Sequence, residues 1–163
     1  MPATRHLKGR ETRQLIREFT HRYPESATTL SSATTFEELP VDESSVIFVD
    51  QRPLIIRTKD LLLPSLRFDE LINTLPKIVV DMGAVAHVAN GAQVMRPGIK
   101  QIRGSFGKGD LVVIVDEKFG KAISIGIAEM DSNAMQSTSK GKVIANVHFV
   151  GDVLWQSFVS KPH

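Results

Sequence analysis

Hydrophobic residues near the start of the chain are spaced as in an amphipathic helix. Within residues 11–21 the apolar side chains that share one helical face are Leu15, Ile16 and Phe19. The dipeptide Tyr23-Pro24 predicts the end of this helix, because the residue before a proline disfavours helical dihedrals. Residues 25–45 show no convincing period and are rich in Ser, Thr and acidic residues, so we predict a linker or a loosely folded segment there.

Short apolar runs then replace the helical spacing. They are separated by polar pairs and predict antiparallel strands at residues 46–50, 53–57 and 60–63. A helix is predicted from Ser65 to Leu75, stopped by Pro76. Residues 1–76 are therefore predicted to form a small α+β domain, with two or three helices on a three-stranded meander.

From Lys77 onward the pattern is that of strands. Residues 110–115 are almost continuously apolar, as in a strand covered on both faces, and residues 121–128 alternate isoleucine with small side chains. Further strands are predicted at 77–80, 143–149 and 154–159, with one short helix inserted after the first of them, at 84–90. We predict a compact mixed β-barrel for residues 77–163, which makes the fold class α+β with a boundary at Pro76.

Glycines divide residues 77–99 into a strand, a small-residue helix and a tight turn. They are Gly83, Gly91 and Gly98. Because little side-chain bulk covers the backbone between them, we interpret this stretch as a binding surface. Free N–H groups at the helix start would favour an anionic ligand such as phosphate. The carboxylate of Asp81 can cap the same groups, and we favour the cap over an open phosphate site.

Four short segments follow one another between residues 83 and 110. They are Gly83-Ala84, Asn90-Gly91-Ala92, Val94-Met95-Arg96-Pro97-Gly98-Ile99 and Lys108-Gly109-Asp110. This order of glycines, a Met-x-Pro-Gly turn and a Gly-Asp strand opening resembles the signature of the PUA domain, the RNA-binding module of pseudouridine synthases and archaeosine transglycosylases. With a different domain in front and Asp152-x-x-Trp155 near the end, the chain resembles the stand-alone PUA proteins related to the malignant T-cell amplified sequence factor.

The resemblance implies a fold and a context. Residues 1–76 would be a pre-PUA domain and residues 77–163 a PUA domain, with a PUA-like mixed β-barrel. It also implies binding of structured RNA, either tRNA or ribosomal RNA, in translation initiation or ribosome recycling. A ribosomal subunit and a partner with an initiation-factor-like domain are the further partners that it implies.

Composition changes this picture little. Of the 163 residues, 42% are hydrophobic and 23% charged, which is ordinary for a globular protein. No apolar run reaches about 18 residues, so we expect no transmembrane helix and no membrane partner. The start of the sequence, Met1 to His6, lacks the apolar stretch of a secretory signal, and we expect a cytoplasmic protein.

Candidate chemistry is sparse. With no cysteine and five scattered histidines, the sequence predicts no disulfide, no metal site and no cofactor. It contains no Gly-x-Ser-x-Gly elbow, P-loop or His-Glu-x-x-His motif. We interpret Asp81 and Asp110 as turn caps rather than an acid/base pair, and we expect no catalytic residues and no enzyme activity.

The distribution of charge along the chain is more informative than the net charge, which is +2. Residues 1–22 carry a basic group that consists of Arg5, Lys8, Arg10, Arg13, Arg17 and Arg22, against two acids. A second group contains Arg96, Lys100, Arg103 and Lys108, with no acid between them. Clustered cations attract phosphates. For the helical arginines, a solvated face and a contact with RNA or a partner both remain open.

The candidate RNA-binding residues combine the glycine-rich stretch with the second basic group. They are Gly83, Ala84, His87, Gly91, Ala92, Arg96, Pro97, Gly98, Lys100, Arg103 and Lys108. Gly91 is expected to close the helix in a left-handed conformation. Arg96, held extended before a proline, is expected to point to solvent, while Met95 and Trp155 are interpreted as buried packing residues.

These observations lead to one hypothesis and two alternatives. The leading hypothesis is a non-catalytic RNA-binding protein of the translation apparatus. The first alternative is an accessory RNA-specificity subunit of a tRNA-modifying enzyme. The second is a ribosome-bound protein adaptor, in which the N-terminal domain docks a partner protein.

Overall fold

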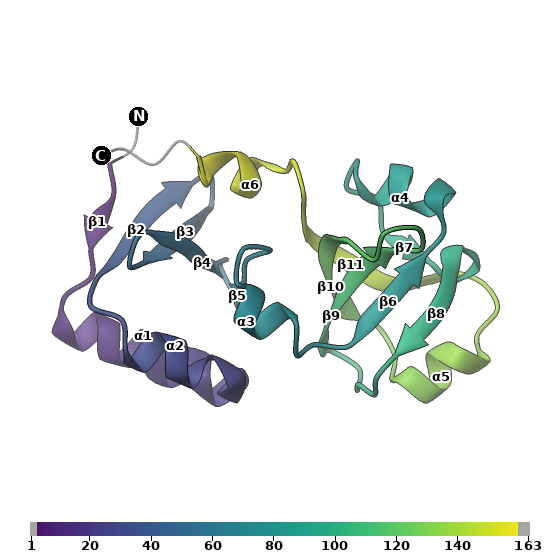
Figure 1. Cartoon of the computed structure of the whole chain (residues 1–163), viewed down its shortest axis with the longest axis horizontal. Coiled ribbons are helices and arrows are strands. Elements are labelled where there is room, and N and C mark those ends of the chain that lie inside the picture. Colours follow the sequence, from purple (N-terminus) through teal and green to yellow (C-terminus); the bar gives the residue numbers. More distant parts are fainter. Residues whose placement is uncertain (1–2, 160–163) are drawn as a thin grey trace. The chain divides into compact units, whose positions relative to one another are not determined.

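The computed structural model describes residues 3–159, which divide into two compact units (Figure 1). The second unit consists of Leu75–Asp152, and the first contains the described residues before it together with those after it. The sequence-based boundary at Pro76 lies within two residues of the first junction. Residues 153–159, however, were assigned to the second domain and lie in the first unit.

The first unit is built on one antiparallel sheet with the strand order β1-β2-β3-β4-β5. The strands are β1 (Arg5–His6), β2 (Phe36–Val41), β3 (Ser44–Val49), β4 (Arg52–Arg57) and β5 (Leu62–Pro64). The helices are α1 (Gly9–Arg22), η1 (Pro24–Ser26), α2 (Ala27–Ser31), α3 (Asp69–Ile72) and α6 (Val153–Ser157). Figure 1 shows α1 and α2 on one side of the sheet and α6 on the other. Residues 46–49 of β3 are accordingly at most 1% exposed, because both faces are covered.

Four sequence-based predictions fail in this unit, the first being the three-stranded meander, because the sheet has five strands. The segment 25–45 is ordered rather than loose, since Leu30, Phe36 and Leu39 are buried and β2 pairs with β3 along its whole length. The helix predicted from Ser65 to Leu75 is shorter in the structure, where α3 spans only Asp69–Ile72. The last predicted strand is the helix α6, whose Trp155 is half-buried beside Arg67, the guanidinium carbon lying 4.6 Å from the ring centroid.

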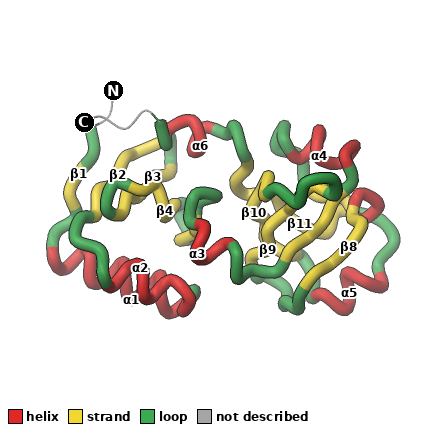
Figure 2. The backbone as a smooth tube through the Cα atoms, viewed as in Figure 1, coloured by secondary structure: helices red, strands yellow, loops and turns green. Residues whose placement is uncertain are grey.

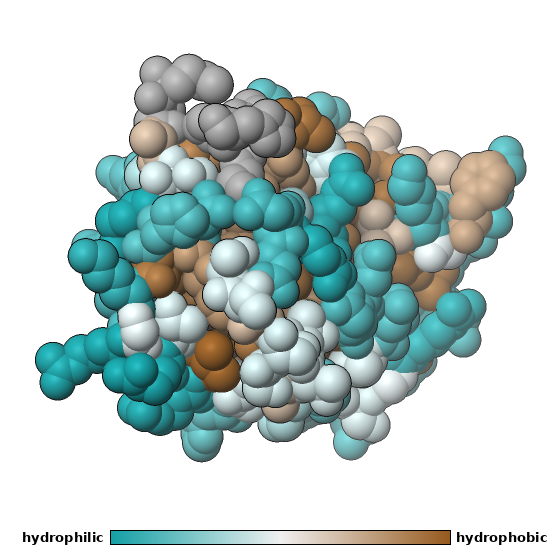
Figure 3. Space-filling view, turned by 60° about the vertical axis from the view of Figure 1, so that its left-hand side comes forward, coloured by the Kyte–Doolittle hydropathy of each residue, from teal (hydrophilic) through white to brown (hydrophobic). Residues whose placement is uncertain are grey.

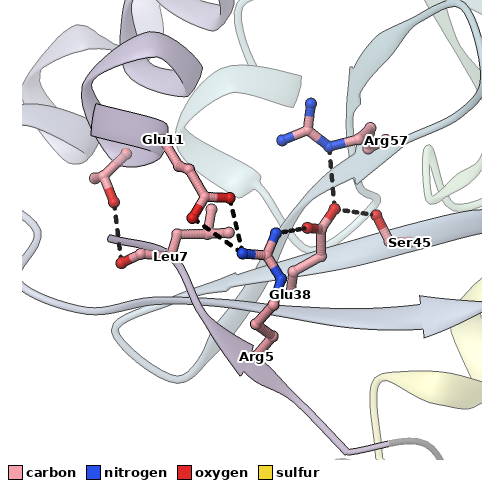
Figure 4. Close-up of polar contacts among 7 residues, drawn as sticks. Arg5, Leu7, Glu11, Glu38, Ser45 and Arg57 are labelled. Carbon is pink, nitrogen blue, oxygen red and sulfur yellow. Dashed lines mark hydrogen bonds and ion pairs between the residues drawn. The ribbon is translucent and has the colours of Figure 1, made fainter. Parts of the chain in front are cut away.

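The carboxylate of Glu38 on β2 is held by side chains from three other strands (Figure 4). Arg5 donates to its Oε1 at 3.0 Å, while Ser45 and Arg57 donate to its Oε2. Arg5 also pairs with Glu11 of α1, with 2.8 Å between Nη1 and Oε2. Burial raises the pKa of Glu38, but the hydrogen bonds from Ser45 and Arg57 outweigh it and hold this pKa below its usual value. A polar residue of β2 therefore joins β1, β3, β4 and α1.

The second unit contains a six-stranded sheet with the order β7-β11-β10-β9-β6-β8. Strands β6 and β9 run parallel, and the other neighbours are antiparallel. The strands are β6 (Lys77–Val80), β7 (Val94–Met95), β8 (Ile99–Arg103), β9 (Leu111–Asp116), β10 (Ala122–Ala128) and β11 (Lys142–Phe149). The helices are α4 (Met82–Val88), η2 (Arg96–Gly98) and α5 (Ser132–Ser137).

The strands of this unit curl around a core, with α4 and α5 at opposite ends (Figure 2). The core includes Ile78, Val80, Val88, Val112, Ile114, Val143 and Ile144. Gly126 of β10 permits the close packing, because a Cβ at this position would collide with the side chain of Ile144. The predicted mixed β-barrel with a short helix inserted after its first strand is confirmed, in the form of a curled half-barrel (Figure 2).

The surface carries few large hydrophobic side chains. Figure 3 shows a face that is mostly hydrophilic, interrupted by smaller hydrophobic patches. Within residues 3–159, no helix is both long and apolar enough to cross a bilayer. The same residues contain no group of three or more His, Asp or Glu side chains placed to hold a metal ion.

Candidate functional site

A groove of about 630 Å³ lies in the second unit between α4 and the β7–η2 turn. The residues that line it are Asp81, Ala84, His87, Val88, Ala92, Gln93, Val94, Met95, Pro97 and Gly98. Most of them are small or apolar, and the polar side chains among them are those of Asp81, His87 and Gln93. The glycine-rich stretch thus forms a concave surface, as expected for a ligand site.

Asp81 positions the start of α4. Its Oδ1 accepts a hydrogen bond from the backbone N–H of Ala84 at 2.7 Å, which makes Asp81 the N-cap of the helix. Its own N–H donates to the carbonyl oxygen of Gly98 at 2.9 Å and ties the helix start to η2. The predicted cap is confirmed, and the carboxylate occupies the helix start where a phosphate cradle was the alternative.

Gly98 brings the two walls of the groove into contact. A Cβ on Gly98 would lie 2.8 Å from the Cβ of Ala84, closer than side-chain atoms approach. Glycine is therefore required for α4 to pack on η2. Gly83 is different, because its Cβ would lie 3.4 Å from Asp81 Oδ1, near an ordinary contact, and its φ is not positive.

The far end of α4 is fastened to the sheet by Asn146 of β11. Its Nδ2 donates to the carbonyl oxygens of Val88 at 3.1 Å and Ala92 at 3.0 Å. Its Oδ1 accepts from the hydroxyl of Ser124 at 2.8 Å. Gly91, between the two carbonyls, has φ of +90°, which confirms the predicted left-handed end of the helix. Sequence reasoning missed Asn146, and an asparagine within an apolar strand was the available signal.

Two side chains of the turn differ from the sequence-based expectation. Met95 was interpreted as a core residue, but it is 49% exposed, because in the two-residue strand β7 Val94 takes the inward position. Arg96 was expected to reach solvent. Instead its Nε donates to the carbonyl oxygen of Met135 at 2.8 Å and its Nη1 to that of Ile99 at 3.3 Å. The guanidinium therefore joins η2 to α5 and β8.

The candidate residues fall into three groups. Those that line the groove are Ala84, His87, Ala92, Pro97 and Gly98. Gly83, Gly91 and Arg96 shape the adjoining backbone without lining it. The exposed cations Lys100 and Arg103 lie on β8, which is an edge strand, and Lys108 lies in the loop that follows. None of these three cations has an ion-pair partner within residues 3–159.

The site has the chemistry of a binding surface. The walls are mostly small and apolar, and His87, which is exposed, supplies a ring beside them. The carboxylate of Asp81 is already engaged as the helix cap. The free cations of β8 and its following loop add positive charge suited to a polyanion.

Comparison with known proteins identifies the second unit. The family model for the PUA domain matches residues 76–150. An uncharacterised protein of Methanocaldococcus jannaschii is 39% identical over 117 residues, which cover 70% of this chain and 71% of that protein. Translation machinery-associated protein 20 of Saccharomyces cerevisiae is 32% identical over 121 residues, covering 70% and 67%.

Solved structures extend the similarity to nearly the whole chain. The PUA domain structure from Aeropyrum pernix, a tartrate complex, matches with a TM-score of 0.81 and 26% identity, covering 98% of this chain and 92% of that one. The resemblance to stand-alone PUA proteins is confirmed, and the malignant T-cell-amplified sequence 1 proteins match over a shorter span. With its PUA domain at residues 76–150, the chain belongs to the family of stand-alone PUA-domain proteins that includes translation machinery-associated protein 20.

Proposed function

We propose that this protein binds structured RNA in the translation apparatus and catalyses no reaction. Support comes from the PUA domain and from a relative whose name places it with the translation machinery. The RNA would be a tRNA or a ribosomal RNA, bound in the cytoplasm. The ribosomal subunit and a partner with an initiation-factor-like domain belong to the same proposal.

The groove beside α4 is the observation that carries the proposal. Sequence-specific RNA recognition mostly uses unpaired bases, which are flat, largely apolar on their faces and polar at their edges. The groove offers small apolar walls for such a face, with His87 and the side-chain NH2 group of Gln93 available to base edges, while the Oε1 of Gln93 accepts from the N–H of Asn146. Lys100, Arg103 and Lys108 would hold the sugar-phosphate backbone beside it.

A substitution that fills the groove tests this placement. Ala92 lines the groove and is exposed, so Ala92→Leu adds bulk there with little effect on stability. We expect this variant to bind a labelled tRNA about tenfold more weakly, as loss of one inserted base predicts. Fluorescence anisotropy titration at one fixed salt concentration gives the comparison.

Ala86→Leu is the control with the same change in size, because Ala86 is exposed on α4 and does not line the groove. It should bind as the unsubstituted protein does. Equal RNA affinity of the two folded variants would place RNA elsewhere. Crosslinking in cell extract followed by sequencing of the bound RNA then separates tRNA, ribosomal RNA and absence of RNA.

A further inference from the structure

Three large hydrophobic side chains of the second unit are exposed. Within residues 75–152 they are Met82, Met95 and Phe119, with exposed fractions of 42%, 49% and 76%. Met82 begins α4 directly after β6, and Met95 lines the groove. Phe119, the most exposed of the three, lies in the turn between β9 and β10.

This turn adjoins the groove. Strands β6 and β9 are parallel neighbours, with Val80 opposite Asp116, so the two strands have their C-terminal ends side by side. The N–H of Glu117 donates to the carbonyl oxygen of Val80 at 3.0 Å. Asp81, the next residue of the chain, lines the groove. Figure 1 shows the turn on the side of the sheet where α4 lies. The turn that carries Phe119 therefore lies next to Asp81, at the border of the groove.

A buried carboxylate holds the turn in shape. Asp116 is only 5% exposed, and its carboxylate accepts hydrogen bonds from the backbone N–H groups of Phe119 and Lys121. These bonds, that of Phe119 foremost, lower the pKa of Asp116, so it remains ionised at neutral pH. The backbone that carries the exposed ring is thus fixed before any ligand arrives.

The surroundings of the ring favour an anionic partner with flat groups. Lys118 Nζ lies 5.3 Å from the centroid of the Phe119 ring, and Lys121 is exposed immediately after the turn. The remaining neighbours within the turn are Glu117 and Gly120, both exposed. A protein hot spot needs a ring enclosed by further packing groups, which this turn does not supply. A single ring flanked by lysines suits one RNA base and its phosphates.

We propose that Phe119 stacks on an unpaired RNA base outside the groove, while Lys118 and Lys121 contact neighbouring phosphates. This inference rests on the proposed RNA-binding function and adds a second contact to it. The groove would take one unpaired nucleotide, and the turn a nucleotide that lies outside it on the same RNA.

The test compares ring substitutions by titration with a labelled RNA hairpin that carries a single-stranded 3′ tail. Phe119→Ala and Phe119→Leu should each bind about tenfold more weakly, because neither side chain has a π face, whereas Phe119→Trp should keep the affinity. In a Trp155→Phe background, the tryptophan at position 119 is the single one in the chain, and RNA should quench its fluorescence. Because residue 119 is exposed, we expect these variants to fold. Thermal unfolding checks this.

Lysine variants separate stacking from charge. Lys118→Ala with Lys121→Ala should flatten the salt dependence of binding, whereas Phe119→Ala should leave that slope unchanged. The control is Lys59→Ala, which removes an exposed lysine of the first unit.

Each outcome decides a separate point. If Phe119→Ala binds like the unsubstituted protein while Ala92→Leu does not, the inference about the turn fails and the groove stands. If Phe119→Leu retains full affinity, or if Trp fluorescence does not respond to RNA, a stacked base is excluded. If the unsubstituted protein binds no RNA, the proposed function fails together with the inference.

Discussion

Asn146 and Arg96 fix the walls of the groove through backbone carbonyls rather than through the groove surface. Asn146 bonds the carbonyl oxygens of Val88 and Ala92, and Arg96 bonds that of Met135. The carbonyls of Val88 and Met135 are part-buried and would be costly to leave without a donor. Asn146 and Arg96 therefore help to fix where each wall lies. Replacing Asn146 or Arg96 should therefore alter the shape of the groove, although neither residue lines it.

Asn146→Ala should destabilise the second unit by about 1–3 kcal/mol, because two carbonyls lose their donor and Ser124 loses its acceptor. Hydrogen exchange of residues 88–93 should accelerate, and affinity for tRNA should fall with it. Asn90→Ala is the control, since Asn90 bonds only the exposed end of α4, at the carbonyl oxygen of Ala86. Equal exchange rates in the two variants would contradict the role given to Asn146.

Local rules predicted some of these residues and not others. Asp81 and Gly91 follow from the sequence, because a helix cap and a left-handed helix end depend on neighbours within a few residues. The contacts of Arg96 do not follow from the sequence, since its partner Met135 lies 39 residues further along the chain. The prediction that Met95 is buried fails for a related reason. Which side chain of the two-residue strand β7 points inward depends on its pairing with β11, which comes much later in the chain. Short-range patterns therefore predict backbone geometry better than side-chain direction.

At the scale of elements, β8 presents its cations along the open edge of the sheet. Lys100 and Arg103 lie on this strand and Lys108 follows it, all three exposed. An edge strand has one free side, and charged side chains there remain accessible to a large polyanion. The edge is therefore the natural place for phosphate contacts next to the groove.

Replacing Lys100, Arg103 and Lys108 with Ala should weaken tRNA binding and flatten its salt dependence. Each lost phosphate contact should remove roughly 0.7–0.9 from the slope of log affinity against log salt. Titrations at several salt concentrations give this slope directly. An unchanged slope in a folded variant would remove β8 from the interface.

The control for charge is a triple alanine variant at Arg10, Arg13 and Arg17, three of the exposed arginines of α1. It changes net charge by the same amount in the other unit. A slope like that of the unsubstituted protein would identify these arginines as a solvated face. A flattened slope would show that α1 also contacts RNA.

Elements were predicted where one residue pattern dominates. Helix α1 and strands β9 and β10 agree with their apolar periods to within about two residues. Strand β2 was missed because Glu37, Glu38 and Pro40 interrupt its apolar residues. The partners that accommodate those glutamates are Arg5, Arg57 and Gln51, which lie far away in the sequence. A strand stabilised by such pairs has no recognisable apolar period.

At the scale of the whole molecule, the chain enters the second unit once and returns from it to the first. Helix α6 packs against β2 and β3, so the first unit is completed by residues that follow the second unit in the sequence. A change in α6 should therefore affect residues more than a hundred positions earlier and spare those directly before it.

Leu154→Ala should show this separation. Leu154 is 8% exposed in α6, and its truncation should destabilise the first unit by at least about 2 kcal/mol. Hydrogen exchange should accelerate in β2 and β3 and stay unchanged in β9 and β10. Val153→Ala, at a half-exposed neighbouring position, should have little effect. Equal acceleration in both units would contradict the assignment of α6 to the first unit.

The position of α6 in the sequence also sets an order of events during synthesis. A ribosome completes Leu75–Asp152 before it adds the first residue of α6. The PUA barrel thus has all its strands while the sheet of the first unit still lacks the cover of one face. Because domains fold as units, the sheet of the first unit gains the packing of α6 only after every residue of the second unit has been synthesised.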